Sequence, residues 1–516
     1  MLFERAWLAL LGFGAYLVLR SIYRLFFHPL RKIPGPRLVA ITHGVEFYYN
    51  CVLDGRYIME IEKMHQKYGP IVRVSPHEVH IIDPTFYDEI YAPSSRRRDK
   101  SVRVTKATGI GGSMIATAPH DHHRIRRAFL SEFFSRRSIL NMTPMIDRYL
   151  LKLGDRLGEL HDSKTVVRLD NALNAFTSDI ITEYCYGKSW GFLEDKRFRS
   201  DTRGALLETA NTLHIGQFAP WLIMLLRKIP IHILRRMQPG KATIFEAMEA
   251  VYDQAVSSFN VAPGNPSAET EKRENRNMFD NLVDPAVPAS ERTLDRLQDE
   301  GLVVLGAGTE TVAHTLTMSM FYLCKNQDVL QRLRTELKQV LPTPSSTASL
   351  VELEKLPYLV RVSSQIEAYN DPKAKANAYG PIGRMPRVAP TETLRYGEYV
   401  IPPGTPMSAI NYFIHRDPTF FPNPDKFEPE RWLQGSESED LKRYIVNFTK
   451  GSRGCLGITL AYAEIYKGIA GLARRFDFEL HDTTMEDMKV VGERVFTITR
   501  RGQIQMYVTV SDLAKM

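Results

Sequence analysis

A glycine-rich stretch near the C-terminus, FTKGSRGCLG, places Cys455 among three glycines and an arginine. Glycines let the backbone turn tightly and expose its N–H groups, and such groups stabilise a thiolate and lower its pKa. The sequence from Ile458 onward predicts a helix that begins near the sulfur, with its partly positive end toward it. A single soft ligand suits an iron ion whose other positions are filled by a porphyrin, and it does not suit a four-ligand zinc site.

A second stretch able to do chemistry is AGTET, from Ala307 to Thr311, in the proline-free run from Glu291 to Asn326. On a helix, Ala307, Gly308 and Thr311 share a face. Small side chains there would let a flat ring approach the helix, and the neighbouring Thr311 hydroxyl and Glu310 carboxyl could transfer protons. Helix packing is the alternative explanation when this stretch is taken alone.

Together the two stretches resemble motifs of the cytochrome P-450 superfamily. The first matches the family's haem-ligand loop, Phe-x-x-Gly-x-Arg-x-Cys-x-Gly, and AGTET resembles its oxygen-activating motif. The resemblance implies haem b with Cys455 as axial thiolate and sole metal ligand. It also implies haem contacts from Ala307 and Gly308 and from the loop residues Phe448, Gly451, Arg453 and Gly457.

Further basic residues fit the same resemblance. His123 and Arg127 stand at i and i+4 in HRIRRAFLSEFF, which resembles the helix that contacts the haem propionates; His123 replaces the family's usual tryptophan. Arg387 in GPIGRMPRV resembles another propionate contact, and bidentate arginine suits such carboxylates. Arg431 in FEPERW resembles the arginine that locks the core beneath the haem. For Arg124 and Arg126 of HRIRRAFLSEFF, a solvated basic face is the alternative.

One motif of the family is missing. The family pattern has Glu-x-x-Arg on the helix before GPIGRMPRV, but Glu367 is followed three residues later by Asn370, and Pro372 then stops the helix. Three explanations stay open for the segment from Ser363 to Gly380: true divergence, a mistaken gene model such as a retained intron, or a degenerate, inactive member. We favour the second.

The missing arginine has an expected cost. If the protein is made as written, we expect Arg431 to lose its charged partners, and a buried unpaired charge costs several kcal/mol. Poor haem retention and low stability should follow.

The fold expected from the chain is mainly α with small peripheral β-sheets, the cytochrome P-450 fold, in 516 residues with 44% hydrophobic content. We expect a short β-hairpin from Ile71 to Asp83, a second hairpin within 392–411 with its turn at Pro-Pro-Gly, and paired strands near the C-terminus. No internal domain boundary is evident after residue 40.

The N-terminus predicts a membrane anchor. Ala6 to Leu19 carries no charge, and with Ser21 to Tyr23 and Leu25 to Phe27 this apolar segment, within residues 1–27, approaches the ~20 residues that span a bilayer. Arg20 and Arg24 at its end would reach the headgroups. Residues 28–40 form a Pro/Gly hinge and 41–516 the catalytic domain. Basic residues follow the apolar stretch, which predicts a single-pass protein of the endoplasmic reticulum membrane with a cytoplasmic catalytic domain. A cleaved signal peptide is the alternative.

The resemblance implies a monooxygenase that inserts one oxygen atom into an apolar small molecule. The stretch GPIVRVSPHEVHI resembles sequences of the fungal branch of trichodiene-oxygenase-like enzymes, which act on terpenoids and related secondary metabolites. The chain carries no flavin or nicotinamide fingerprint, so electrons are expected from an NADPH–cytochrome P-450 reductase, with a cytochrome b-type donor as a second candidate. The net charge of +8 suits an acidic partner. We expect a monomer that does not bind nucleic acid. A haem-thiolate isomerase or dehydratase and an inactive remnant are the alternatives.

Overall fold

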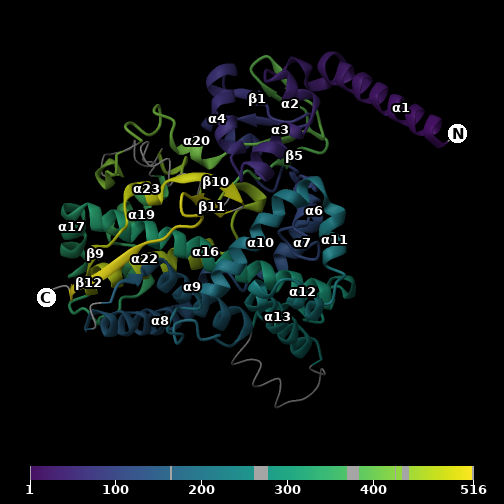
Figure 1. Ribbon diagram of the computed structural model, residues 1–516. Coiled ribbons are helices and arrows are strands. Elements are labelled where there is room, and N and C mark those ends of the chain that lie inside the picture. The colour runs from purple at the N-terminus through teal and green to yellow at the C-terminus, as the bar shows by residue number, and fades with distance from the viewer. Residues whose placement is uncertain are drawn as a thin grey trace.

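Helices dominate the computed structural model, which describes residues 2–162, 165–260, 277–368, 383–424, 426–432, 441–494 and 496–513 (Figure 1). The α-helices are α1 (Leu2–Ile22), α2 (Arg37–Ile41), α3 (Gly44–Phe47), α4 (Tyr57–Tyr68), α5 (Tyr87–Ile90), α6 (Val102–Ala107), α7 (His120–Ser131), α8 (Arg136–Asp162), α9 (Leu169–Tyr186), α10 (Ser200–Phe218), α11 (Pro220–Leu226), α12 (Ile231–Met237), α13 (Ala242–Asn260), α15 (Met278–Leu282), α16 (Leu294–Lys325), α17 (Gln327–Leu337), α18 (Leu350–Leu353), α19 (Pro357–Ala368), α20 (Asn411–His415), α22 (Ile458–Arg475) and α23 (Met485–Met488).

The long helix α16 is the centre of the main core, as its apolar middle predicts. Its N-terminus is capped by Thr293, whose side chain accepts a hydrogen bond from the amide of Arg296. Helices α9, α13 and α22 pack against it. Two of its glycines permit this close packing: a Cβ on Gly301 would lie 2.5 Å from Val251 of α13, and one on Gly308 would lie 2.6 Å from Ile181 of α9.

The strands form small sheets at the margin of the helices, which confirms the expected fold class (Figure 1). The strands are β1 (Ile71–Arg73), β2 (Val79–Ile81), β3 (Asp99–Lys100), β4 (Val167–Arg168), β5 (Arg387–Val388), β6 (Leu394–Tyr396), β7 (Tyr399–Ile401), β8 (Pro406–Ser408), β9 (Phe476–Leu480), β10 (Val490–Arg494), β11 (Phe496–Thr499) and β12 (Tyr507–Leu513). Their orders are β1-β2-β8-β5-β3, β4-β12-β9, β10-β11 and β6-β7.

The β1–β2 hairpin is confirmed, but two other strand predictions were wrong in detail. The second hairpin turns at Gly397, which has φ +54°, between β6 and β7. The Pro402-Pro403-Gly404 turn instead leads to β8 in another sheet, because a proline has no N–H for a ladder. Near the C-terminus, β11 and β12 do not pair with each other; β11 pairs with β10, and β12 pairs with β9 and β4.

The N-terminal helix projects away from the rest of the chain (Figure 1). The segment Phe3–Phe27 is long and apolar enough to cross a membrane, with a mean hydropathy of 1.5 and none of its most apolar window buried. The expectation that Arg24 reaches the headgroups was wrong. Its side chain is buried and turns back to donate to the carbonyl of Ile41 at 2.5 Å. Pro34 accepts from the Arg73 amide at 2.8 Å, so the hinge is tied to β1.

Candidate active site

The loop that carries Cys455 is shaped by close backbone contacts. Gly451 has φ +73°, and a Cβ there would lie 2.1 Å from the carbonyl oxygen of Ala92, so only glycine fits without displacement. The Cys455 amide donates to the Phe448 carbonyl at 2.9 Å. Helix α22 begins at Ile458 with Gly457 as its N-cap, as the sequence predicts. The Cys455 side chain is exposed at the end of this loop.

The Cys455 thiol does not have the lowered pKa that the glycine-rich loop suggested. Although the side chain contacts solvent, the protein atoms packed around it hinder its hydration. This raises the pKa above its ordinary value and outweighs the lowering by the Gly457 amide and the nearby Arg127. Arg127 donates to the carbonyl of Gly454 at 2.7 Å, so it also fastens α7 to the loop. A thiolate here therefore needs a further positive partner, such as a metal ion.

Four basic side chains gather close to this loop. Lys100 and Arg387 face each other across the β3–β5 pair, which sets their backbones side by side. His123 of α7 and Arg453 join them, and all four side chains are at least nine-tenths buried. Arg453 donates to the carbonyls of Arg98, Thr117 and Ala118, at 3.0, 2.7 and 2.6 Å.

The charged members of this cluster repel one another. Burial, and then the neighbouring cations, lower the pKa of His123 to about 2, so its ring is neutral at pH 7. Burial and Arg387 lower the pKa of Arg453 to about 9, although Asp99 offsets part of this shift. Burial also lowers the pKa of Lys100, with Arg387 and Arg453 adding to the shift, and burial lowers the pKa of Arg387 against the opposing effect of Tyr91 and Tyr87. The Nη2 atom of Arg387 is buried and makes no hydrogen bond to any described residue. This arrangement is costly unless an anionic ligand completes it.

One face of α16 is less covered than the rest of the helix. Val303, Ala307, Thr311 and Thr315 form a stripe at intervals of four, in which Ala307 is exposed and the others half-buried, although most neighbours are buried. The Thr311 hydroxyl donates to the carbonyl of Ala307 at 2.8 Å. A Cβ on Gly308 would lie 2.6 Å from Ile181 of α9, so the small size of this residue serves helix packing; its contact with the ring stays a prediction.

Glu310 lies in a buried ionic network. Its two carboxylate oxygens accept from Arg203 of α10 at 2.8 and 2.9 Å, and one also accepts from Asn174 at 3.1 Å. Arg203 in turn donates to Asp170 at 2.5 Å. The pairing with Glu310 and Asp170 raises the pKa of Arg203 in spite of its burial. Arg203 and Asn174 therefore hold the Glu310 side chain in place in the observed arrangement.

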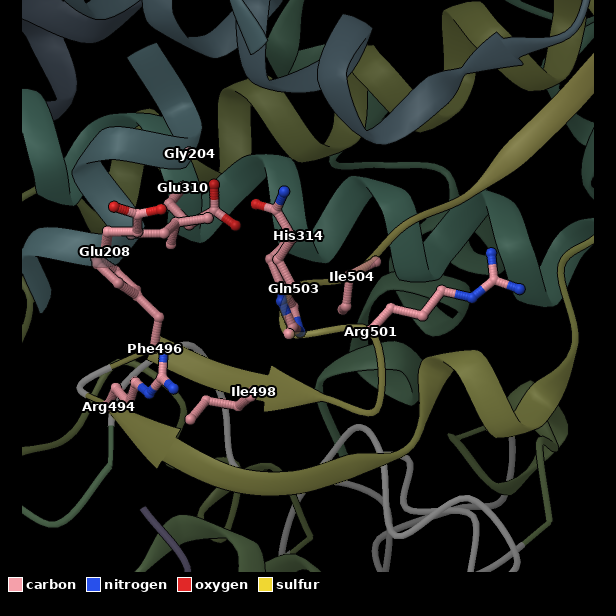
Figure 2. Close-up of a pocket in the computed structure, with 12 residues that line it drawn as sticks. Gly204, Glu208, Glu310, His314, Arg494, Phe496, Ile498, Arg501, Gln503 and Ile504 are labelled. Atoms are coloured by element: carbon pink, nitrogen blue, oxygen red, sulfur yellow. The ribbon is translucent and has the colours of Figure 1, made fainter. Parts of the chain in front are cut away.

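The same network borders a cavity of about 210 Å³ between α10, α16 and the β10–β11 hairpin. Glu310 and His314 line it from α16, and Phe496 and Ile498 line it from the hairpin (Figure 2). Burial lowers the pKa of His314 to about 4, so the ring is neutral at pH 7. The Oε1 atom of Gln503, which also lines the cavity, is buried and has no hydrogen-bond partner among the described residues. Such a cavity is polar enough to hold water.

Comparison with known sequences identifies the family of the chain. The family profile described as "Cytochrome P450" matches residues 34–364 and 378–506. The chain belongs to the cytochrome P450 family. Its relatives include "Cytochrome P450 monooxygenase TRI4" of Fusarium sporotrichioides, 40% identical over 481 residues, which are 93% of this chain and 90% of the relative. "Conidiogenone synthase PchP450" of Penicillium rubens is 42% identical over 502 residues, 97% of this chain and 98% of the relative. "Cytochrome P450 monooxygenase astB" of Aspergillus terreus is 40% identical over 497 residues, 96% and 95% of the two chains.

As a cytochrome P450, the protein is a haem-dependent monooxygenase, and its relatives are fungal enzymes of secondary metabolism, as the resemblance suggested. The described residues fit haem. Two propionates would satisfy the buried basic cluster and the unpartnered Nη2 of Arg387, and the stripe on α16 offers small side chains to a flat ring. The family implies haem with a cysteine thiolate ligand, and Cys455 would supply that thiolate.

The P450 family match is interrupted where the Glu-x-x-Arg motif is missing. It leaves out residues 365–377, inside the segment from Ser363 to Gly380 that departs from the family pattern. Residues 369–382 and the side chain of Glu367 lie outside the described part of the structure. Within the described part, the Trp432 indole donates to Gln365 of α19 at 3.0 Å. Arg431 donates to the carbonyls of Pro422, Asn423 and Lys426.

Two residues of this P450 site were not found from the sequence. Lys100 follows a run of arginines, and that basic run is a signal that could have singled it out. Arg203 stands in an ordinary helical pattern and carries no local signal. Its role depends on α9 and α16, which are distant in sequence.

Replacing Arg387 with glutamine should weaken haem binding. The loss of a charged hydrogen bond, worth ~1.5–3 kcal/mol, would speed haem loss about ten- to hundredfold. Haem transfer to apomyoglobin measures this rate. Arg395→Gln, an exposed arginine on β6, is the matched control and should leave the rate unchanged. Because Arg387 is a buried cation with repelling neighbours, the haem-free chain should not lose stability in R387Q. Equal rates of haem loss in both variants would show that Arg387 does not bind haem.

Proposed function

We propose that the chain is a membrane-anchored haem-thiolate monooxygenase that inserts one atom of dioxygen into an apolar terpenoid or a related secondary metabolite. The second oxygen atom leaves as water. The observation that carries this proposal is the Cys455 loop beside a cluster of buried cations that fits a dicarboxylate. Relatives named as fungal P450 monooxygenases and as conidiogenone synthase support the substrate class.

Each residue of the site has a proposed role in binding haem. Cys455 ligates the iron, while His123, Arg127, Arg387 and Arg453, with Lys100, hold and orient the carboxylate edge of the haem. Phe448, Gly451 and Gly457 shape the loop, and Ala307 leaves room for the ring. Bound haem supplies the activation of dioxygen.

Proton handling falls to Glu310 and Thr311. The Thr311 hydroxyl donates to a backbone carbonyl and keeps its lone pairs free to accept a hydrogen bond. Glu310 is paired with Arg203, so it must part from the guanidinium before it can carry a proton toward the open face of α16. The cavity lined by Glu310 and His314 provides space for the water that would supply that proton.

Electrons come from an NADPH–cytochrome P-450 reductase, with a cytochrome b-type donor as the second candidate. The positive charge of the chain supports docking to an acidic partner. The apolar α1 and the basic residues that follow it support a single pass through the endoplasmic reticulum membrane, with a monomeric catalytic domain in the cytoplasm.

A second candidate is an inactive product of a mistaken gene model. The observation that favours it is the interruption of the family match at residues 365–377. Sequencing the transcript across Ser363 to Gly380 decides between them. A transcript that encodes the segment as written excludes the gene-model explanation, and one that lacks it supplies the sequence to be expressed.

The test of the monooxygenase proposal uses isotopic oxygen. The protein, reconstituted with a fungal reductase and NADPH, is supplied with sesquiterpene and diterpene hydrocarbons under ¹⁸O₂. Products that carry one ¹⁸O atom, detected by mass spectrometry, are expected. Rearranged or dehydrated products without ¹⁸O would identify the isomerase or dehydratase alternative instead.

A further inference from the structure

A second cavity, of about 510 Å³, lies between the segment that follows α9, the start of α10 and one face of α13. It shares no lining residue with the cavity of about 210 Å³ beside Glu310. Its volume is within the range of ~300–1,000 Å³ that is usual for small-molecule sites. Lys188, Glu246 and Ala250 line it and are exposed, so the cavity is open to solvent. We call this cavity the α13 slot.

One wall of the α13 slot is aromatic. Tyr186, Trp190 and Phe192 line it, and their rings are nearly parallel. The ring centroids of Tyr186 and Trp190 are 5.4 Å apart at an interplanar angle of 22°, and those of Trp190 and Phe192 are 6.4 Å apart at 17°. Aromatic side chains attract a further ring, either offset-stacked or edge to face. This wall therefore favours an aromatic ligand.

The aromatic wall is held in place by the surrounding fold. The carboxylate of Asp179, which is 0% exposed, accepts hydrogen bonds from the Ser189 hydroxyl and the Phe192 amide, each at 2.8 Å. The Tyr186 hydroxyl donates to the carbonyl of Gly301 on α16 at 2.7 Å. A binding surface that is already ordered loses little conformational entropy when a ligand binds. The rings are thus preorganised.

The face of α13 that forms the other wall carries small side chains. Thr243, Ala247, Ala250 and Gln254 recur at intervals of three and four residues, so they share one face of the helix. The two alanines leave space beside the rings. Val251, on another face, is fully buried, and α13 packs against α16 and α10 (Figure 1). A space between aromatic rings and a fixed helix face with small side chains suits a flat molecule.

The charges of the α13 slot balance. Two bases, Lys188 and Arg199, and two acids, Glu246 and Asp253, line it, so the lining has no net formal charge. The Arg199 guanidinium lies over the Phe192 ring, 5.4 Å from its centroid. Because neither sign of charge is in excess, the slot favours a neutral ligand.

One hydroxyl of the α13 slot lacks a hydrogen bond. The Oγ1 atom of Thr243 is buried and has no hydrogen-bond partner among the described residues. A buried polar group that stays unsatisfied is costly. Threonine in a helix populates two χ1 rotamers, so rotation of this side chain can turn the hydroxyl toward a ligand. A polar group on the ligand would then complete its hydrogen bonding.

We propose that the α13 slot is a binding site for a neutral, flat aromatic molecule of two or three fused rings that carries a hydroxyl or a similar group for Thr243. The site is separate from the proposed catalytic centre, because its lining includes no residue of the Cys455 loop or of the open stripe on α16. Its occupation therefore does not depend on the proposed function and can be measured without turnover.

The first test is photolabelling of the full-length protein in lipid nanodiscs with 6-azido-2-naphthol, mapped by mass spectrometry. Label is expected in peptides that cover 186–202 and 243–254, and excess 2-naphthol should protect these peptides. Ala250→Trp should lower this label about tenfold or more, because the indole fills the space beside the rings. Ala289→Trp changes an exposed alanine outside the slot and should leave the label unchanged. Absent or unprotected label, or equal label in the two variants, would overturn the site.

The second test identifies the groups that bind the ligand. The concentration of 2-naphthol that halves the label should rise about two- to tenfold in Trp190→Leu, which removes an aromatic partner. Naphthalene should protect several-fold less well than 2-naphthol, and Thr243→Val should abolish this difference. An unchanged half-protection concentration in W190L would overturn the role of the aromatic wall. A difference that persists in T243V would overturn the contact with Thr243. Because Ala250 is exposed, A250W keeps the test decisive if W190L does not fold.

Discussion

Replacing Arg203 with methionine should lower the free energy of unfolding by about 3–5 kcal/mol. The guanidinium is buried and hydrogen-bonds to the carboxylates of Glu310 and Asp170, which are themselves 4% and 0% exposed. Methionine fills a similar volume but leaves Glu310 without its cationic partner in a low-dielectric interior, while Asp170 keeps only Arg168 as an ion-pair partner among the described residues. Equilibrium unfolding in urea measures the change.

A matched control separates burial from simple loss of an arginine. Arg197 pairs with Asp201 close by in sequence, but those side chains are 77% and 62% exposed. Arg197→Met should therefore change stability by less than about 1 kcal/mol. Adding Glu310→Gln to R203M should restore part of the loss, because the amide carries no charge. Equal stability of R203M and R197M would show that the network around Glu310 is not formed.

Stability should fall steeply as the pH drops below 6.5. His65, His80 and His415 are buried, and burial lowers their pKa values: to about 4 for His65, to about 3 for His415 and well below the ordinary value for His80. His65 and His80 also share a hydrogen bond of 2.6 Å. The unfolded chain binds protons near pH 6.5 while the folded chain does not, so protons favour unfolding.

The expected slope is large. Each such histidine contributes ~1.4 kcal/mol per pH unit below pH 6.5, which gives about 4 kcal/mol per unit for these three until the folded values are reached. His123 and His314 add to this slope, whereas buried Glu300, whose pKa is raised to about 7, opposes part of it. Native stability is only ~5–15 kcal/mol, so unfolding is expected above pH 4. Urea melts between pH 8 and 5 measure the slope. His80→Leu should reduce this slope by the contribution of about one proton, ~1.4 kcal/mol per pH unit. His232→Gln, at an exposed position, should leave the slope unchanged. A free energy of unfolding that does not change from pH 7 to 5 would contradict the burial of these histidines.

The parts of the site that are continuous in sequence were predictable. The Cys455 loop and the stretch from Ala307 to Thr311 carry their residues at fixed local spacing, and the structure places them on the expected loop and helix. Residues whose role depends on distant partners were not predictable. Lys100 lies opposite Arg387 because of the register of β3 with β5, and the spacing of residues in the sequence does not predict that register.

The errors have a common physical origin. Arg24 was assigned to the headgroups because it ends an apolar run, but a carbonyl of the folded domain accepts a hydrogen bond from its guanidinium. The Cys455 pKa was expected to fall because local amides were counted without the surrounding protein atoms that hinder hydration of the thiolate. In each case a local rule was overridden by a tertiary contact.

The most direct test of the haem-thiolate assignment is the carbon monoxide difference spectrum of the reduced protein expressed from this sequence. A strongly red-shifted Soret band is expected, present in Cys324→Ser and lost in Cys455→Ser, because the Cys455 thiolate holds the iron. A band on the blue side, or no bound haem in the unmodified protein, would contradict thiolate ligation by Cys455 in the chain as written.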